Sequence, residues 1–298
     1  MKVILSRKGF DSSYGGTASV ILPNGKDMIS FPITATSCES LNSKELKLSE
    51  LSYNGYNYLE LLRQLCKNRK TDFEKFVIDR PCHLDPDIRE VITDKSFNKG
   101  KKWIPAFGQC NGALTHLMNN DVSVGDLFIF FGWFRHTKLR PNGVISYDNK
   151  YQEKQVMFGY LQIGEIIDNN DIGIRCPWHP HAIKENYDEN NKLFLASDDL
   201  CIDGNFVLDS KGEKIPGYGM FNYCDELTLT KNGMSRTKWD KNKLFSGLEK
   251  TKITHHNYNS IKKDYFQSAN IGQEFVIDGT KEVKDWAVNI IRKGNERI

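Results

Sequence analysis

The sequence predicts an α+β protein with a mixed, largely antiparallel sheet or small barrel and flanking helices. Two apolar segments, 125–135 and 155–167, have the aliphatic and aromatic content of buried strands. Two others, 56–67 and 283–294, repeat apolar residues at the spacing of amphipathic helices. No linker of distinct composition separates these segments, so we expect residues 1–298 to form a single compact unit.

The first third of the chain predicts short strands joined by turns. Residues 1–5 predict a buried strand, and a turn at 22–26 separates strands expected at 18–21 and 28–33. Residues 36–55, rich in Ser, Lys and Asn, predict a loop. We expect Asp85 to cap a helix that begins at Pro86.

The middle of the chain contains the strongest strands. The segment 125–135 is apolar on both faces and needs cover on both. Both strands place a glycine between aromatic residues, at Gly132 and Gly159, which is typical of a bulge or a close backbone approach. We expect the polar segment 136–154 to project from the surface, a short helix at 112–118, and small strands and loops over 184–260.

Composition excludes several classes of protein. The net charge of +3 permits a basic face, but a protein that binds nucleic acid chiefly by charge is usually more basic. The longest apolar run, 127–134, is far shorter than the roughly 20 residues of a membrane helix. The amino terminus lacks a signal peptide's apolar region, so we expect a cytoplasmic protein that begins at Met1. Seven cysteines without a CxxC pair argue against a disulfide framework and a thiolate zinc site.

The stretch SRKGFDSSYGG, residues 6–16, is suited to binding an anion. It combines cationic donors, hydroxyls and glycine backbone that a ligand can approach closely. Its spacing matches neither a P-loop nor the dinucleotide fingerprint. Asp11 could act as a base or pair with Arg7, and the alternative for the whole stretch is an exposed turn with solvated charges. The candidate residues are Ser6, Arg7, Lys8, Asp11, Ser12, Gly15 and Gly16.

A second candidate is the segment RPCHLDPD, residues 80–87. Imidazole titrates near neutral pH and a carboxylate can orient it, so His83 with Asp85 or Asp87 could perform acid–base catalysis. The alternative is structural, since a helix cap explains Asp85 and the positive first turn of a helix suits Asp87.

A third candidate is the segment PWHPH, residues 177–181. His179 and His181 would lie on one side of an extended segment and could bind a metal only with a third ligand, from His83, His116 or a carboxylate. We assign no metal and no cofactor, and expect one histidine to contact a ligand and the other to pack.

Amides and aromatic residues form the last candidate group. Gln109, Gln273 and Glu274 could read the hydrogen-bonding edge of a base, while Trp133 or Tyr160 could stack on its face. The alternatives are amides that satisfy buried backbone groups and aromatic residues that belong to the core.

Seven motifs follow one another from residue 1 to about 290: SRKGFDSSYGG, RPCHLDPDI, AFGQ, GDLFIFFGWFR, MFGYLQIGEII, WHPH and GQEFV. In this order they resemble the third nucleotide modification associated domain family, grouped by occurrence with base-modification systems of bacteria and phages. The resemblance implies an association with nucleotide or DNA modification, and no particular reaction. The matching polar positions are Ser6, Arg7, Lys8, Asp11, Ser12, Gly15, Gly16, His83, Asp85, Asp87, Gln109, Gly132, Trp133, Arg135, His179, His181, Gln273 and Glu274.

A narrower resemblance covers residues 124–167. A Gly-Asp pair before an apolar strand, followed by a strand that ends in IGEII, resembles the PUA-like barrels of the ASCH and EVE type. That group includes modules that bind RNA or modified DNA bases.

These observations lead to a hypothesis and two alternatives. The hypothesis is group transfer or glycosidic-bond chemistry on a nucleotide, nucleoside or base, in DNA rather than RNA, with Arg7, Lys8, Asp11, His83 and Asp85 as catalytic residues. The first alternative is a non-catalytic reader of a modified base that stacks it on Trp133 and Tyr160. The second is a structural partner of a DNA-modification enzyme.

Overall fold

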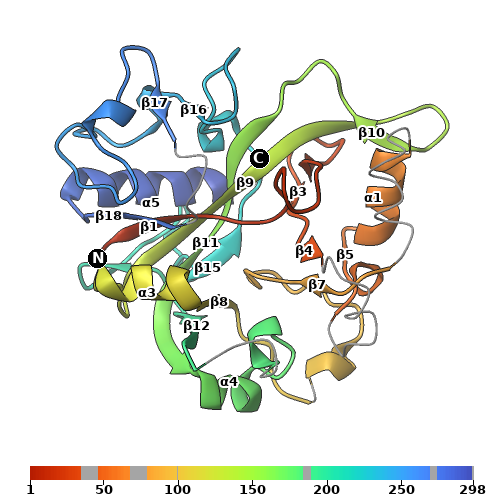
Figure 1. Cartoon of the computed structure of the whole chain (residues 1–298), viewed down its shortest axis with the longest axis horizontal. Helices are drawn as coiled ribbons and strands as arrows, with labels where there is room; N and C mark the ends of the chain where they lie inside the picture. Colours follow the sequence, from red (N-terminus) through yellow and green to blue (C-terminus); the bar gives the residue numbers. More distant parts are fainter. Residues whose placement is uncertain (35–45, 68–78, 99, 184–188, 269–273, 297–298) are drawn as a thin grey trace.

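A curled sheet lies at the centre of the computed structural model, which describes residues 1–34, 46–67, 79–98, 100–183, 189–268 and 274–296 (Figure 1). Its main path runs β18–β1–β9–β11–β12–β8. β1 and β9 are parallel and every other neighbouring pair on this path is antiparallel. The predicted α+β class with a mixed, largely antiparallel sheet is therefore confirmed. The path strands are β1 (Val3–Arg7), β8 (Ala106–Cys110), β9 (Leu127–Leu139), β11 (Lys154–Asp168), β12 (Asn191–Ala196) and β18 (Glu274–Ile277).

The two glycines in aromatic surroundings behave as predicted. The β9–β11 register shifts between Met157 and Gly159, which marks a bulge. A Cβ on Gly159 would lie 2.4 Å from Ile88 Cδ1, and one on Gly132 would lie 2.7 Å from the carbonyl oxygen of Lys8. Both positions therefore permit a close approach that a side chain would block.

Phenylalanines fill the interior of the curl. Phe107 on β8 lies 4.8 Å from Phe128 and 5.1 Å from Phe130 between ring centroids, although two strands separate β8 from β9 in the sheet. The sheet must curl to bring these rings together. Helix α3 (Asn111–Asn119) packs against β8, β12 and β18, and so connects the first and last strands of the path.

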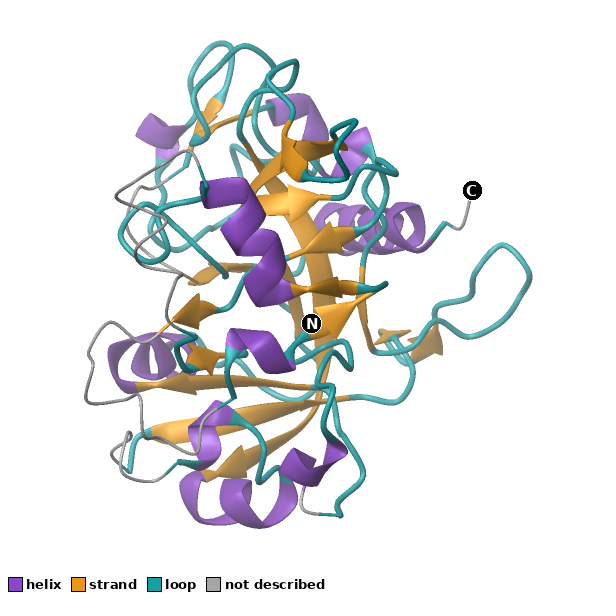
Figure 2. Cartoon of the chain, turned by 90° about the vertical axis from the view of Figure 1, so that its right-hand side faces the viewer, coloured by secondary structure: helices purple, strands orange, loops and turns teal. Residues whose placement is uncertain are grey.

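Helices lie on the outside of the strands (Figure 2). α5 (Lys281–Asn295) is capped by Thr280, buries the predicted stripe of Val283, Trp286, Ile290 and Ile291, and packs on β1 and β11. α1 (Tyr58–Cys66) begins at Asn57, whose side chain accepts from the backbone of Leu59 and Glu60, and it packs on β10. α4 (Asn169–Arg175) packs against β11 and β12. No helix among the described residues is long and apolar enough to cross a membrane.

Smaller elements complete the chain. The predicted strands around the turn at 22–26 are confirmed, and the described region 189–268 consists of small strands, 3-10 turns and loops, as expected for 184–260. The single-domain organisation stays a prediction. The short strands are β2 (Ser19–Ile21), β3 (Met28–Ile29), β4 (Ile33–Thr34), β5 (Ser52–Tyr53), β6 (Tyr56–Asn57), β7 (Cys82–His83), β10 (Ile145–Tyr147), β13 (Cys201–Ile202), β14 (Asn205–Phe206), β15 (Tyr218–Met220), β16 (Lys238–Trp239) and β17 (Phe266–Gln267). The 3-10 turns are Leu48–Glu50, Lys95–Asn98, Pro180–Ala182, Asp225–Leu227, Lys241–Lys243 and Tyr258–Ser260.

Two sequence predictions are wrong, and a third segment has more regular structure than its composition indicates. The loop expected at 36–55 contains a 3-10 turn and β5 in its described part, from residue 46. The segment 136–154 is largely a hairpin, because β9 continues to Leu139 and pairs with β10, and residues 138–143 at its tip are exposed, which agrees with the predicted surface position. No helix begins at Pro86: the Asp85-Pro86 peptide is cis, and Asp87 instead pairs its backbone with Ala106.

Candidate functional site

A buried carboxylate joins the end of β1 to β8 and β18. Glu274 Oε1 accepts hydrogen bonds from Ser6 Oγ at 3.2 Å and Gln109 Nε2 at 2.5 Å, and it lies 3.2 Å from Lys8 Nζ. The side chain of Glu274 is 2% exposed, so the cation and the two donors compensate its desolvation. The ion pair with Glu274 in turn holds the Lys8 ammonium, which lies 4.4 Å from the centroid of the Phe107 ring.

Asp85 carries a second buried carboxylate. Its Oδ1 accepts from the Gly108 backbone N–H at 2.8 Å and lies 3.5 Å from His179 Nε2, while Oδ2 lies 3.8 Å from His83 Nε2. Burial opposes ionisation, but the imidazoles of His179 and His83 and the charge of Lys8 outweigh it and hold the pKa of Asp85 well below its usual value. Lys8 thus connects Asp85 electrostatically to the Glu274 cluster.

The two histidines of the WHPH segment turn toward Asp85. They lie in a 3-10 turn, Pro180–Ala182, capped by His179, so the predicted extended segment is wrong although both imidazoles do converge. The ring of His181 lies directly on the backbone of Gly108, where a Cβ would be 2.3 Å from His181 Cδ2. Burial lowers the pKa of His179, and it lowers the pKa of His181 to about 3. Both imidazoles are therefore neutral near pH 7.

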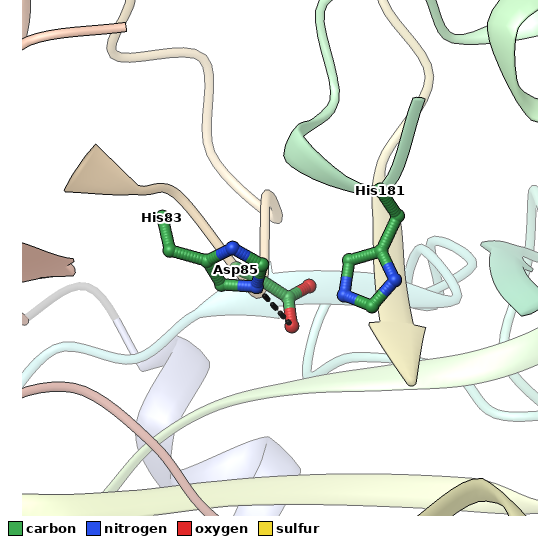
Figure 3. A group of neighbouring side chains, drawn as sticks. All are labelled: His83, Asp85 and His181. Carbon is green, nitrogen blue, oxygen red and sulfur yellow. Dashed lines mark ion pairs between the residues drawn. The ribbon is translucent and has the colours of Figure 1, made fainter. Parts of the chain in front are cut away.

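Figure 3 shows His83 and His181 on opposite sides of the Asp85 carboxylate. Each of the three residues offers one ligand atom, and these atoms all lie within 4.8 Å of one another. The side chain of His83 is 35% exposed whereas that of Asp85 is 3% exposed, so a small molecule can reach the group from the His83 side.

A cavity lies beside Asp85. Its wall includes Tyr58, Arg89, Phe158 and Met220. The guanidinium of Arg89 lies 3.3 Å from the Tyr53 ring centroid, and Nη2 donates to the carbonyl of Met28 at 3.0 Å. The rest of the wall is mostly apolar, and its polar side chains are Ser30, Asp85, Arg89 and the Tyr58 hydroxyl.

The family model described as nucleotide modification associated domain 3, Nmad3, matches residues 2–278 of this chain. The chain belongs to the Nmad3 family. No curated protein and no solved structure matches it. The family's name associates the chain with nucleotide modification, and the match includes both carboxylate clusters.

In this Nmad3 chain the two cations of the SRKGFDSSYGG stretch lie in different surroundings. Lys8 faces Glu274 and Asp85. Arg7 instead lies near Arg236. Burial lowers the pKa of Arg236, and the positive charge of Arg7 lowers it further. Arg236 in turn donates to Ser12 Oγ at 3.0 Å and lies 3.8 Å from the Trp133 ring centroid. The two adjacent cations therefore contribute to different surroundings.

Asp11 and the nearby glycines shape a turn. Asp11 Oδ1 accepts from the backbone of Ser13 and Tyr14, each at 2.7 Å, and Gly16 N–H donates to the Asp11 carbonyl. Gly15 has a φ of +88°, and a Cβ there would lie 2.2 Å from Phe10. These contacts agree with the turn alternative for Asp11, Gly15 and Gly16, and the role of Asp11 as a base stays a prediction.

Other predicted site residues lie away from Asp85 or inside the core. Asp87 is buried and accepts from the indole N–H groups of Trp103 and Trp178. Tyr160 is also buried, with its ring stacked on Phe221 and its hydroxyl donating to the Pro216 carbonyl, so the idea that it stacks on a ligand does not fit. Arg135 donates to Asn149 at 2.9 Å. Gln273 lies outside the described residues.

Sequence reasoning missed three contributors to the site of this family member. They are the Gly108 N–H on Asp85, Arg89 in the cavity wall and Asn191, whose Oδ1 lies 2.6 Å from His181 Nδ1. The AFGQ motif contained Gly108, but nothing in the local sequence marks Arg89 or Asn191, since tertiary contacts alone bring them to the site.

Proposed function

We propose that the protein modifies a nucleotide, nucleoside or DNA base by group transfer or glycosidic-bond chemistry at the Asp85 site. The observation that carries this proposal is the buried, ionised Asp85 carboxylate between two imidazoles, one of them reachable from outside. Perturbed ionisable groups in an accessible site are characteristic of catalysis. The association of the Nmad3 family with nucleotide modification supports the substrate class.

Each residue of the Asp85 site has a separate role in the proposed reaction. His83 takes or gives a proton at the substrate, and Asp85 orients this imidazole and stabilises its charged form. Lys8 stabilises negative charge that develops on the substrate. Glu274 and Gln109 hold Lys8 in place, and the apolar cavity wall accepts the base or sugar.

The test is mass analysis of ligands after incubation with purified protein. The panel comprises deoxynucleoside mono- and triphosphates, a short DNA in single-stranded and duplex form, and RNA of the same sequence. We expect a covalently altered DNA or deoxynucleotide, and little alteration of the RNA. Asp85→Asn should reduce the rate by about 100-fold or more, since general acid–base catalysis contributes about 10²–10⁴-fold.

Two further variants sharpen the result. Lys8→Met removes the charge that lies over Phe107 but keeps a long unbranched side chain, and it should slow the reaction. His136→Ala is the control: this ring stacks on Tyr151, at 4.1 Å between ring centroids, and takes no part in the proposed site, so the variant should retain the wild-type rate. Saturable binding with no altered ligand would contradict catalysis and favour the reader alternative. An unchanged rate in Asp85→Asn would contradict the assignment of the site.

A further inference from the structure

The hydrogen bonds of His181 determine which of its ring nitrogens faces Asp85 with a lone pair. Asn191 Nδ2 lies 3.0 Å from the carbonyl oxygen of His181, which can only accept, so this Asn191 atom is the amide nitrogen. Asn191 Oδ1 must then be the atom 2.6 Å from His181 Nδ1. Because an amide oxygen only accepts, Nδ1 carries the proton and Nε2 keeps its lone pair.

Neighbouring groups orient the Asp85 carboxylate through Oδ1, and Oδ2 faces His83. Oδ1 is occupied by the Gly108 N–H at 2.8 Å. His179 Nδ1 accepts from the His181 backbone N–H at 3.3 Å, which puts the proton on Nε2, and this N–H faces Oδ1 at 3.5 Å. Oδ2 instead faces His83 Nε2 at 3.8 Å. Within the described part of the chain, these outer contacts orient the carboxylate through Oδ1 and not through Oδ2, as such contacts do around metal-binding carboxylates.

The backbone makes room for this arrangement. The His181 ring occupies the place where a side chain at residue 108 would be, because any Cβ there would lie 2.6 Å or less from three of its ring atoms. The ligand atoms of His83, Asp85 and His181 all lie within 4.8 Å of one another, and ligands of a tetrahedral ion with bonds near 2.1 Å lie about 3.4 Å apart. Rotation of the partly exposed His83 side chain can shorten this spacing.

We propose that His83, Asp85 and His181 bind one divalent first-row transition-metal ion, with Zn²⁺ as the probe that tests it. Two imidazoles and one carboxylate form a donor set typical of catalytic sites that keep open positions, unlike the four-ligand structural sites. The open positions would face the exposed side of His83.

The proposal goes beyond the function proposed above and does not require it. With an ion bound, His83 and Asp85 would be ligands, and the ion would supply an activated water in place of the proton transfer assigned to His83. If no ion binds but a ligand is altered, the acid–base assignment stands alone. If an ion binds but no nucleotide is altered, the metal site stands and the proposed reaction fails.

The experiment uses the full chain, treated with a chelator and then dialysed. Zn²⁺ is added, and stoichiometry is measured by elemental mass spectrometry and affinity by calorimetry. We expect one ion per chain in the wild type. His181→Ala should weaken binding by more than about 100-fold, since even the loss of outer contacts costs about 10–100-fold. His136→Ala should bind as the wild type does.

Two further measurements keep the proposal testable if His181→Ala does not fold. His83→Ala alters a partly exposed side chain, and it should lose the ion as well. Co²⁺ in the wild type should give visible absorption bands that disappear in His83→Ala. Absence of a bound ion in the wild type would overturn the proposal, as would Zn²⁺ binding that is unchanged in the folded ligand variants.

Discussion

Replacement of Asp87 by Asn should change how the stability of the protein depends on pH. Burial raises the pKa of Asp87 to about 7, although two indole N–H groups donate to Oδ2 at 2.8 and 3.0 Å. Oδ1 is buried and has no hydrogen-bond partner among the residues that the structure describes. The folded state therefore retains a proton that the unfolded chain, with an aspartate pKa near 3.9, loses at lower pH.

The sign and size follow from this difference in proton binding. Between the two pKa values the folded state binds more protons, so each rise in pH favours unfolding until the folded carboxyl also ionises near pH 7. Relative to Asp87→Asn, the wild type should lose roughly 2–3 kcal/mol of unfolding free energy between pH 5 and pH 8. The buried histidines also titrate, but their contributions cancel in the difference between the two proteins.

Urea unfolding at pH 5, 6, 7 and 8 measures this difference directly. Asp209→Asn provides a matched control, because turn hydrogen bonds lower the pKa of this exposed carboxyl and leave it ionised over the whole range. That variant should follow the pH dependence of the wild type. A free-energy difference between wild type and Asp87→Asn that stays constant from pH 5 to pH 8 would refute the reasoning.

Three further predictions concern packing and capping, each measured by urea or thermal unfolding. Gly108→Ala should lower stability by about 1–3 kcal/mol because its methyl overlaps the His181 ring, whereas Gly112→Ala, with open space around it, should be neutral or stabilising; equal effects would contradict the close approach. Phe130→Ala should cost about 3–5 kcal/mol, since the ring is fully buried in the curl, and a loss below 1 kcal/mol would contradict its place in the core. Thr280→Ala should cost about 0.5–2 kcal/mol through the lost cap of α5 and Thr280→Ser much less, so similar losses would argue against the cap.

The sequence predicts those strands and helices whose apolar pattern lies within one continuous segment. The apolar runs of β9 and β11 and the stripes of α1 and α5 appear in the sequence because each is long and strongly patterned. The order of the strands and the curl that brings Phe107 onto Phe128 depend on contacts between distant segments. The Asp85-Pro86 pair is typical of a helix start in the sequence, but in the structure this peptide bond is cis and no helix begins there.

In the candidate site, too, the residue types can be predicted from the sequence, whereas their spatial arrangement cannot. His83, Asp85, His179 and His181 were selected for their chemistry, but their convergence depends on the 3-10 turn at Pro180–Ala182 and the Gly108 N–H. Arg7 and Lys8 are adjacent in the sequence, yet they belong to different surroundings in the fold. Composition and spacing identify chemistry, whereas only tertiary structure decides which groups meet.

The most direct test of the central claim is nucleoside mass analysis of a short DNA duplex after incubation with wild type and with Asp85→Asn. Catalysis at the Asp85 site predicts a nucleoside of altered mass with the wild type and a rate at least about 100-fold lower with the variant. An unaltered duplex with both proteins, or equal rates of product formation, would contradict it.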